Sequence, residues 1–473
     1  MSEVNKTSQK SSQGPDLRLD HVLASILHRR SSRNQLRRLT TVPHGMADFS
    51  SNAYLSLSSQ SAVQQAFLAR LHAAASTPGS NGSSSLLGSG GSRLLDGNSS
   101  YAESLERTIA AFHRAPAGLL FNSAMDANVG LFGCVPQKGD AIVYDELIHA
   151  SVHDGMRLSR AGKKIPFAHS SVWEVSYPDP NKSPLETVLR SLLHGPDGGL
   201  FRSGERNVFI AVEGIYSMDG DIAPLTEIVD CVERYLPRHN GYIVVDEAHS
   251  TGIIGDRGRG LVCEQGLEKR VWARVLGFGK AMSCTGGIVL CSSTTREYLI
   301  NYARTLIYTT AMAFPTLASI ETAYDFLATG QAEPLLDNLR LLIREAHKLF
   351  EALCTRENAP AELLRVGREN PRSPIIPIFT SHARSLAGYC QARGFMVRPI
   401  VAPTVPKGRE RVRVCLHAAN TMSEVHGLVE AVGAWLAAWR TGTLTEAETL
   451  RQTEREDRAT SNSGTTMVTK ARL

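Results

Sequence analysis

Asp246 and Lys280 are residue types that can act together on a carbonyl compound. Asp246 ends the apolar run 242–245, and Lys280 follows the run 275–278. Such runs are typical of buried parallel strands, whose carboxyl ends bind ligands in open α/β sheets. A lysine amine can hold an aldehyde as a Schiff base, while a carboxylate keeps a pyridine nitrogen protonated. The pair indicates a pyridoxal 5'-phosphate (PLP) site; the alternative is a turn-capping aspartate and a solvated lysine.

Other polar residues follow expected strands and suit the same site. Ala124 and Met125 open a helix after Ser123, where free backbone amides can bind phosphate. His149 can stack on a flat ring, and Ser217 and His249 can donate hydrogen bonds to a ring oxygen. Each also has an ordinary structural interpretation: a helix N-cap, a structural histidine or a Gly-Asp turn.

Arg411 and Arg413 alternate on one expected strand and share a face. One of them can reach a substrate carboxylate as a bidentate partner. The alternative is a pair of solvated arginines on an edge strand.

Composition excludes several functional classes. The chain has 473 residues, a net charge of +5 and eight cysteines without C-x-x-C spacing. This balance gives no reason to expect nucleic acid, a metal cluster or a disulfide framework, and the cysteines favour an intracellular protein. No apolar run approaches the roughly 20 residues of a membrane span. No nucleotide-type phosphate loop is present.

Strand-like and helical segments alternate through the middle of the chain, which predicts an α/β fold with a mostly parallel sheet. Strands are expected at 117–121, 141–144, 208–212, 242–245, 275–278 and 287–291, and, in a smaller α/β domain, at 375–379, 396–400 and 411–416. We predict an N-terminal arm with a helix (1–46), a large domain (47–330), a small domain (331–440) and a disordered tail (441–473). The glycine- and serine-rich stretch 77–92 is expected to form an active-site loop.

Nine segments in order resemble the α-oxoamine synthases, PLP-dependent enzymes of fold type I. They are DFSSNAYLSL, GSGGSRLLDGN, LLFNSAMDAN, YDELIHAS, EGIYSMDGD, VVDEAHSTGIIGDRGRG, GFGKAMSCTGG, LIYTTAM and APTVPKGRERVRV. The resemblance covers about residues 34–438. It is greatest to members that make 8-amino-7-oxononanoate.

The resemblance implies roles for individual residues. Lys280, Asp246 and His149 match the Schiff-base lysine, the pyridinium partner and the stacking histidine. The other matched cofactor-binding positions are Ala124, Met125, Ser217, His249, Gly277, Thr309 and Thr310, the last two reaching the phosphate of a neighbouring subunit in a homodimer. The matched substrate positions are Arg37, Asn52, Thr404 and Arg413.

Three departures stand out. Ala124-Met125 replaces a glycine and an aromatic residue, Gly277 stands where a phosphate-binding threonine is usual, and Ala102 stands where a histidine is common. The lost hydroxyl at position 277 removes a hydrogen bond worth about 1.5–3 kcal/mol. The change at Ala102 leaves the acyl substrate open.

The resemblance implies a decarboxylating condensation of an amino acid, expected to be L-alanine, with an acyl-CoA, expected to be pimeloyl-CoA, giving 8-amino-7-oxononanoate for biotin biosynthesis. One alternative is a related synthase that joins an amino acid to a longer acyl or polyketide chain in secondary metabolism. Another is a cofactor-free partner subunit, which Lys280 argues against. A transaminase is a further possibility.

The chain ends in Ala471-Arg472-Leu473, close to a peroxisomal address. We expect a peroxisomal or cytoplasmic location ahead of a mitochondrial one. The basic segment 17–40 could be a transit peptide, which would favour the mitochondrion.

Overall fold

The computed structural model describes residues 18–33, 35–37, 39, 41–76, 86–174, 182–367 and 371–444. The chain divides into two compact units, residues 1–45 and 46–473. The first unit contains helix α1 (Arg18–Ser32), which lies within the helical segment expected at 17–40. The predictions for residues 1–16, for the tail from 445 and for most of the loop 77–92 lie outside the described residues. Location therefore stays a prediction.

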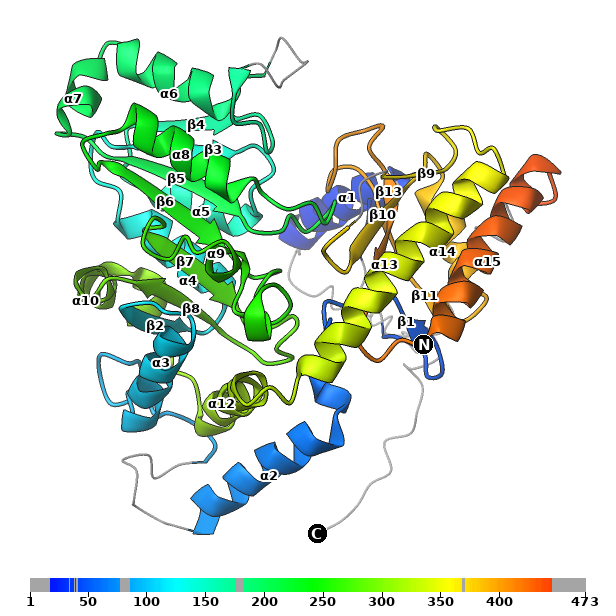
Figure 1. Cartoon of the computed structure of the whole chain (residues 1–473), viewed down its shortest axis with the longest axis horizontal. Helices are drawn as coiled ribbons and strands as arrows, with labels where there is room; N and C mark the ends of the chain where they lie inside the picture. Colours follow the sequence, from blue (N-terminus) through cyan, green and yellow to red (C-terminus); the bar gives the residue numbers. More distant parts are fainter. Residues whose placement is uncertain are drawn as a thin grey trace, which may run out of the picture. The chain divides into compact units, whose positions relative to one another are not determined.

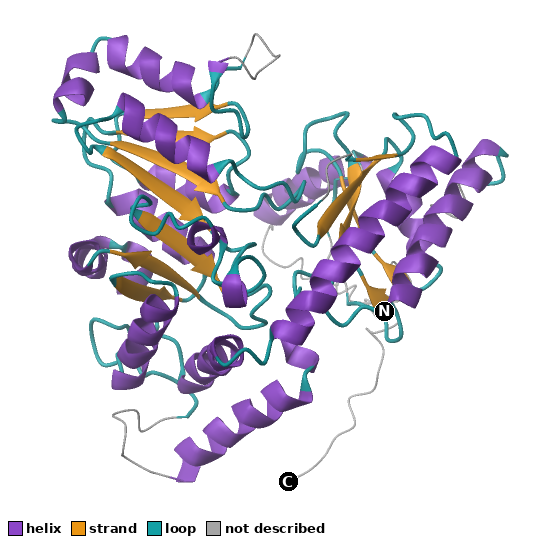
Figure 2. Ribbon diagram, in the orientation of Figure 1, coloured by secondary structure: helices purple, strands orange, loops and turns teal. Residues whose placement is uncertain are grey.

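A seven-stranded sheet forms the framework of the second unit (Figures 1 and 2). Its order is β2-β8-β7-β6-β5-β3-β4, and the five strands from β7 to β4 are parallel, whereas β8 pairs antiparallel with both β7 and β2. The strands are β2 (Ala117–Phe121), β3 (Ala141–Asp145), β4 (Lys163–Phe167), β5 (Val208–Glu213), β6 (Gly241–Asp246), β7 (Ala273–Gly277) and β8 (Gly287–Cys291). The mostly parallel α/β sheet predicted from the sequence is confirmed.

Alternate strand residues point to opposite sides of this sheet, and both sets are mostly apolar. Both faces therefore need a cover, which the helices provide. Val244 packs in one hydrophobic cluster and Val245 in another. The helices up to β8 are α2 (Ser61–Ser76), α3 (Ser100–Phe112), α4 (Ala124–Cys134), α5 (Ala150–Leu158), α6 (Leu185–His194), α7 (Gly198–Ser203), α8 (Leu225–Tyr235) and α9 (Leu261–Glu264), with short 3₁₀ turns η1 (Leu57–Ser59) and η3 (Asp256–Gly258). After β8 come α10 (Ser293–Tyr302), α11 (Arg304–Ile307) and α12 (Phe314–Ala328).

A second, four-stranded sheet has the order β12-β13-β10-β9 and is antiparallel throughout. Its strands are β9 (Arg365–Val366), β10 (Ile375–Phe379), β12 (Arg398–Ile400) and β13 (Arg411–Cys415), accompanied by helices α13 (Glu333–Arg356), α14 (Ala383–Gln391) and α15 (Met422–Arg440). A separate parallel pair joins β1 (Ala47–Asp48) to β11 (Phe395–Met396). This pair brings the segment that carries Asn52 and Tyr54 to the C-terminal part of the chain.

Several expectations needed correction. The single strand predicted at 396–400 is divided into β11 and β12. Helices α2, α5 and α12 and strand β4 were missed; β4 contains Pro166 and lies at the sheet edge, where proline is tolerated. The division between large and small domains at residue 330 stays a prediction, because both sheets lie in the second compact unit. Among the described residues, no helix is both long and apolar enough to cross a membrane.

The Glu106 carboxylate ties α3 to β2 and α10. It is buried, accepts a hydrogen bond from Leu120 N–H at 2.8 Å and one from Arg296 Nη2 at 2.7 Å, and pairs with Arg93. We expect Glu106→Ala to lower the free energy of unfolding by about 3–5 kcal/mol, because two arginines lose their buried partner. Urea unfolding followed by circular dichroism measures this. Glu297→Ala, an exposed position on α10, is the control and should change stability by about 0.5 kcal/mol or less. Equal losses would contradict the assignment.

Candidate active site

Lys280 lies in the turn after β7, where the sequence predicted it. Burial lowers the pKa of the Lys280 amine, against the opposing effect of the nearby carboxylates Asp246 and Glu213, and the positive charge of Arg413 lowers it further. A lowered pKa leaves more of the amine neutral near pH 7. Lys280 is thus suited to attack a carbonyl group or to accept a proton.

Asp246 ends β6 and is buried. Asn128 Nδ2 donates to its Oδ2 at 2.7 Å, and the Ala248 N–H donates to its Oδ1 at 2.9 Å. Asn128 Nδ2 also donates to Ser151 Oγ at 3.0 Å, and Ser151 Oγ lies 2.8 Å from His149 Nδ1. A continuous hydrogen-bonded chain therefore joins the carboxylate to His149.

His149 is the N-cap of α5, and its Nδ1 accepts the Ser151 backbone N–H at 3.2 Å. Burial lowers the pKa of His149, which favours the neutral ring. Because Nδ1 is an acceptor, the single proton of the neutral ring resides on Nε2. The imidazole is thus fixed in orientation, as a residue that stacks on a flat ring must be.

His249 is buried at the end of a second polar chain. Its Nδ1 lies 2.9 Å from the Tyr54 hydroxyl. Arg413 Nη2 donates to Tyr54 Oη at 3.2 Å and to Asn52 Oδ1 at 2.6 Å. Three predicted site residues, Asn52, His249 and Arg413, therefore meet around Tyr54, which sequence reasoning missed.

Arg411 and Arg413 differ in their contacts. Arg411 is buried and forms an ion pair with Asp219, so its guanidinium already has an anionic partner. Arg413 is half-buried, and its Nε is enclosed without a hydrogen-bond partner among the described residues. A buried donor without a partner is costly, and a substrate carboxylate would satisfy it.

Ser217 is carried on a turn after β5 that is fastened at three points. Arg411 binds Asp219, Ser373 Oγ donates to Gly220 O at 2.6 Å, and Asp221 lies 2.7 Å from His169 Nε2. His169 Nδ1 lies 2.9 Å from Asp145, and these carboxylates outweigh burial and raise the pKa of His169 to about 10. The turn is therefore held by charge on both sides, which positions Ser217.

The predicted phosphate cradle is the start of α4. Ser123 caps this helix by accepting the Asp126 N–H at 3.0 Å, so the amides of Ala124 and Met125 belong to the first turn, whose N–H groups lack partners within the helix. Gly277 lies close by, because a Cβ added to it would approach Ala124 Cβ to 3.3 Å and Ala248 Cβ to 2.9 Å. A threonine at position 277 would displace its neighbours.

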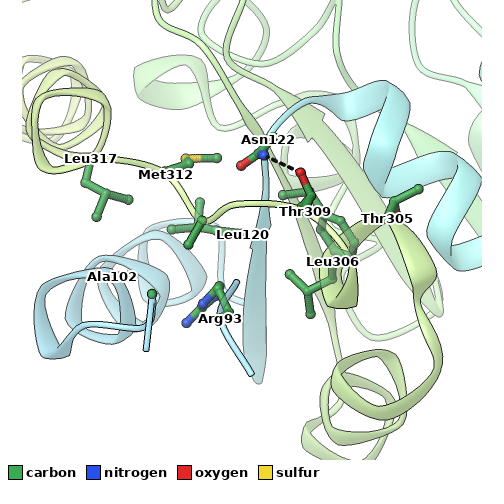
Figure 3. A pocket seen from close by; sticks show the side chains of 12 residues that line it. Arg93, Ala102, Leu120, Asn122, Thr305, Leu306, Thr309, Met312 and Leu317 are labelled. Carbon is green, nitrogen blue, oxygen red and sulfur yellow. Dashed lines mark hydrogen bonds between the residues drawn. The ribbon is translucent and has the colours of Figure 1, made fainter. Parts of the chain in front are cut away.

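Thr309 and Thr310 lie beside this cradle. Asn122, one residue before the cap, donates through Nδ2 to Thr309 Oγ1 at 3.2 Å and to the Thr310 carbonyl at 2.9 Å. Figure 3 shows this contact at the edge of a cavity of about 20 Å³, which Ala102 and Arg93 also line. Lys280 is not among the residues that line this cavity.

Two predicted substrate residues, Thr404 and Arg37, have exposed side chains. Thr404 is exposed on the loop after β12. Arg37 is exposed in the first compact unit. Their roles stay predictions. Sequence reasoning missed Asn128 and Glu213. Glu213 ends β5 as Asp246 ends β6, and Asn128 is a polar residue within the mostly apolar helix α4; these positions were the available signals.

The residues present fit PLP. They supply an amine of lowered pKa, a buried carboxylate fixed by two donors, a fixed imidazole and a helix N-terminus. These groups match an aldehyde, a pyridinium nitrogen, an aromatic ring and a phosphate.

Known proteins are similar to this chain in sequence and in fold. The sequence model of the aminotransferase class I and II family matches residues 44–432. An 8-amino-7-oxononanoate synthase of Emericella nidulans is 51% identical over 88% of this chain and 95% of its own. An aminoacyl transferase sphA of Aspergillus fumigatus is 38% identical over 81% of this chain and 79% of its own.

Solved structures of two such enzymes have a similar fold. Serine palmitoyltransferase of Sphingomonas wittichii has a TM-score of 0.71 at 24% identity, covering 91% of this chain and 100% of its own. An 8-amino-7-oxononanoate synthase of Francisella tularensis has a TM-score of 0.59 at 25% identity, covering 83% of this chain and 98% of its own. The chain therefore belongs to the aminotransferase class I and II family and, within it, to the PLP-dependent α-oxoamine synthases.

Proposed function

We propose that this enzyme condenses L-alanine with pimeloyl-CoA, releasing CoA and carbon dioxide, to make 8-amino-7-oxononanoate for biotin biosynthesis. The observation that carries the proposal is the buried Lys280 amine beside Asp246. The 51% identity to a synthase of that name supports the choice of substrates.

PLP, when bound, withdraws electrons from the amino acid and so makes its Cα proton acidic. Lys280 would hold the aldehyde, Asp246 the pyridinium nitrogen and the start of α4 the phosphate. His149 would lie against the ring, while Ser217 and His249 would donate to its phenolic oxygen. Asp246, His149 and His249 are already held by hydrogen bonds, so these three side chains need little reorganisation on binding.

The chain's own residues then move the proton. The neutral Lys280 amine accepts the Cα proton as general base, which its lowered pKa favours. Arg413 orients the amino acid through its carboxylate, using the Nε that lacks a partner within the described residues. The same Lys280 can return a proton after the new carbon–carbon bond has formed.

A second candidate is a synthase that uses a longer acyl chain. Relatives named aminoacyl transferase sphA, 36% and 38% identical, show that similar chains are not all named 8-amino-7-oxononanoate synthase. Ala102, which stands where the resemblance expects a histidine, leaves the identity of the acyl substrate open.

A panel of substrates separates the two candidates. We expect CoA release from pimeloyl-CoA with L-alanine to exceed that with glycine, serine or palmitoyl-CoA, and to vanish in Lys280→Ala because both the anchor and the base are lost. The absorbance of a thiol reagent that reacts with the released CoA measures turnover, and mass spectrometry identifies the product. Lys269→Ala, an exposed lysine, is the control. Turnover confined to long acyl chains would reject the biotin assignment in favour of the second candidate.

Arg413 gives an independent test of substrate binding. We expect Arg413→Lys to raise the KM for the amino acid about 10- to 100-fold, because a lysine keeps the charge but loses the planar fork. Steady-state kinetics with varied alanine measures it. Arg344→Lys, an exposed position on α13, should leave KM unchanged. An unaltered KM in Arg413→Lys would place the carboxylate elsewhere.

We also propose a homodimer. Large apolar side chains are exposed around the start of α4: Leu87 (91%), Leu95 (77%), Tyr308 (71%) and Met125 (48%). Their segments adjoin, since Ala311 N–H donates to Gly91 O at 2.8 Å and Thr305 Oγ1 to Asp126 O at 2.6 Å. A second copy would cover this surface, as exposed apolar patches usually mark interfaces.

Charge placed on this patch should weaken the dimer. We expect the double variant Leu95→Asp and Tyr308→Asp to shift the protein from dimer to monomer in sedimentation velocity, since a buried unpaired carboxylate is costly. Leu341→Asp adds a charge at another exposed apolar position, on α13, and should leave the dimer intact. A wild-type monomer, or a double variant that stays dimeric, would contradict the proposed interface.

A further inference from the structure

The Tyr54 hydroxyl is the meeting point of three side chains at the predicted ring-oxygen contact. Tyr54 is fully buried. Its hydroxyl lies 2.9 Å from His249 Nδ1, 3.1 Å from Asn52 Oδ1 and 3.2 Å from Arg413 Nη2. Burial raises its pKa well above the ordinary value of 10.0, so the hydroxyl keeps its proton.

Counting protons limits the possible arrangements. Arg413 can only donate, so the Tyr54 oxygen accepts from it. The single Tyr54 proton then points either to His249 Nδ1 or to Asn52 Oδ1. Asn52 Oδ1 already receives Arg413 Nη2 at 2.6 Å, and His249 is the nearer acceptor. The donation to His249 is therefore favoured.

The direction of this bond decides which nitrogen of His249 carries a proton. Burial lowers the pKa of His249 well below 6.5, and the positive charges of Lys280 and Arg413 lower it further. The ring is therefore neutral and has one proton. If Nδ1 accepts from Tyr54, that proton is on Nε2; if Tyr54 turns to Asn52, Nδ1 needs the proton and Nε2 becomes a bare acceptor.

We propose that Tyr54 is a positioning residue: its hydroxyl donates to His249 Nδ1 and so fixes the proton on Nε2, where it can donate to the phenolic oxygen of PLP. This inference rests on the proposed function for the identity of the oxygen. It adds a residue to the site that neither motif nor resemblance had assigned a role.

The test compares Tyr54→Phe with the wild-type holoenzyme. Without the Tyr54 hydroxyl, His249 no longer has a fixed tautomer and the phenolic oxygen loses a donor. The oxygen then keeps more negative charge. The nitrogen that joins Lys280 to PLP therefore binds its proton more tightly. We expect the pH midpoint of the visible absorbance change of bound PLP to rise by about one unit, the size of one hydrogen bond to a charged group.

Tyr324→Phe is a matched control. Tyr324 is also buried, and its hydroxyl lies 3.0 Å from Nε2 of a buried histidine, His113, which is not among the predicted site residues. Its loss should leave the midpoint unchanged while costing similar stability, measured as the melting temperature. A midpoint that stays fixed in Tyr54→Phe, or that moves equally in both variants, would overturn the proposal.

A second measurement depends neither on PLP nor on the folding of Tyr54→Phe. Ring ¹⁵N chemical shifts of the wild-type apoprotein, with the His249 signal assigned by its loss in His249→Gln, report the tautomer directly. Protonated Nε2 supports the proposal, and protonated Nδ1 overturns it. If the wild-type protein takes up no PLP, the proposed function fails, while this measurement still decides the role of Tyr54.

Discussion

The site depends on one electrostatic constraint, the burial of an amine beside two carboxylates at the carboxyl edge of the parallel strands. Glu213 and Asp246 are register partners on β5 and β6, and Lys280 follows β7. Burial, reinforced by the charge of Asp246, raises the pKa of Glu213 well above its ordinary value, so Glu213 favours the neutral form. Asp246, by contrast, receives two hydrogen bonds that suit a charged carboxylate. The two acids thus differ in environment, and a single anion is left to face the amine and any cationic ring nitrogen.

The second sheet supplies the opposite side of this site through one strand. Arg411 and Arg413 lie on the same face of β13 because strand side chains alternate with a period of two. Arg411 reaches Asp219 on the turn that carries Ser217, whereas Arg413 reaches Asn52 and Tyr54, next to His249. Both predicted donors to the phenolic oxygen are therefore braced from β13. A rigid antiparallel strand is a better support for such contacts than a loop, since its position is fixed by pairing on both sides.

Much of this arrangement followed from the sequence, for physical reasons. Buried parallel strands are continuous apolar runs, so β5 and β6 and the acidic residues that end them were predicted closely. Strand β4, with Lys163, Lys164 and Pro166, has no such run and was missed. Alternation placed Arg411 and Arg413 together but could not choose between them, because the choice depends on Asp219, a partner distant in the sequence. Tyr54 stands among apolar residues and its sequence indicates only a core position. Its role depends on three partners that only tertiary structure assembles.

The glycine at position 277 follows from how closely α4 approaches the sheet. Gly277 and Gly287 are register partners on β7 and β8. A Cβ on Gly287 would lie 2.6 Å from the Ala124 nitrogen, and one on Gly277 would meet Ala124 and Ala248. The two glycines therefore allow the first turn of α4 to rest directly on the strands, and the attraction of a helix N-terminus for phosphate is confined to that turn. A threonine hydroxyl at 277 and this close approach exclude one another. A residue larger than glycine at 277 would therefore have to push Ala248 or the first turn of α4 away from the strands.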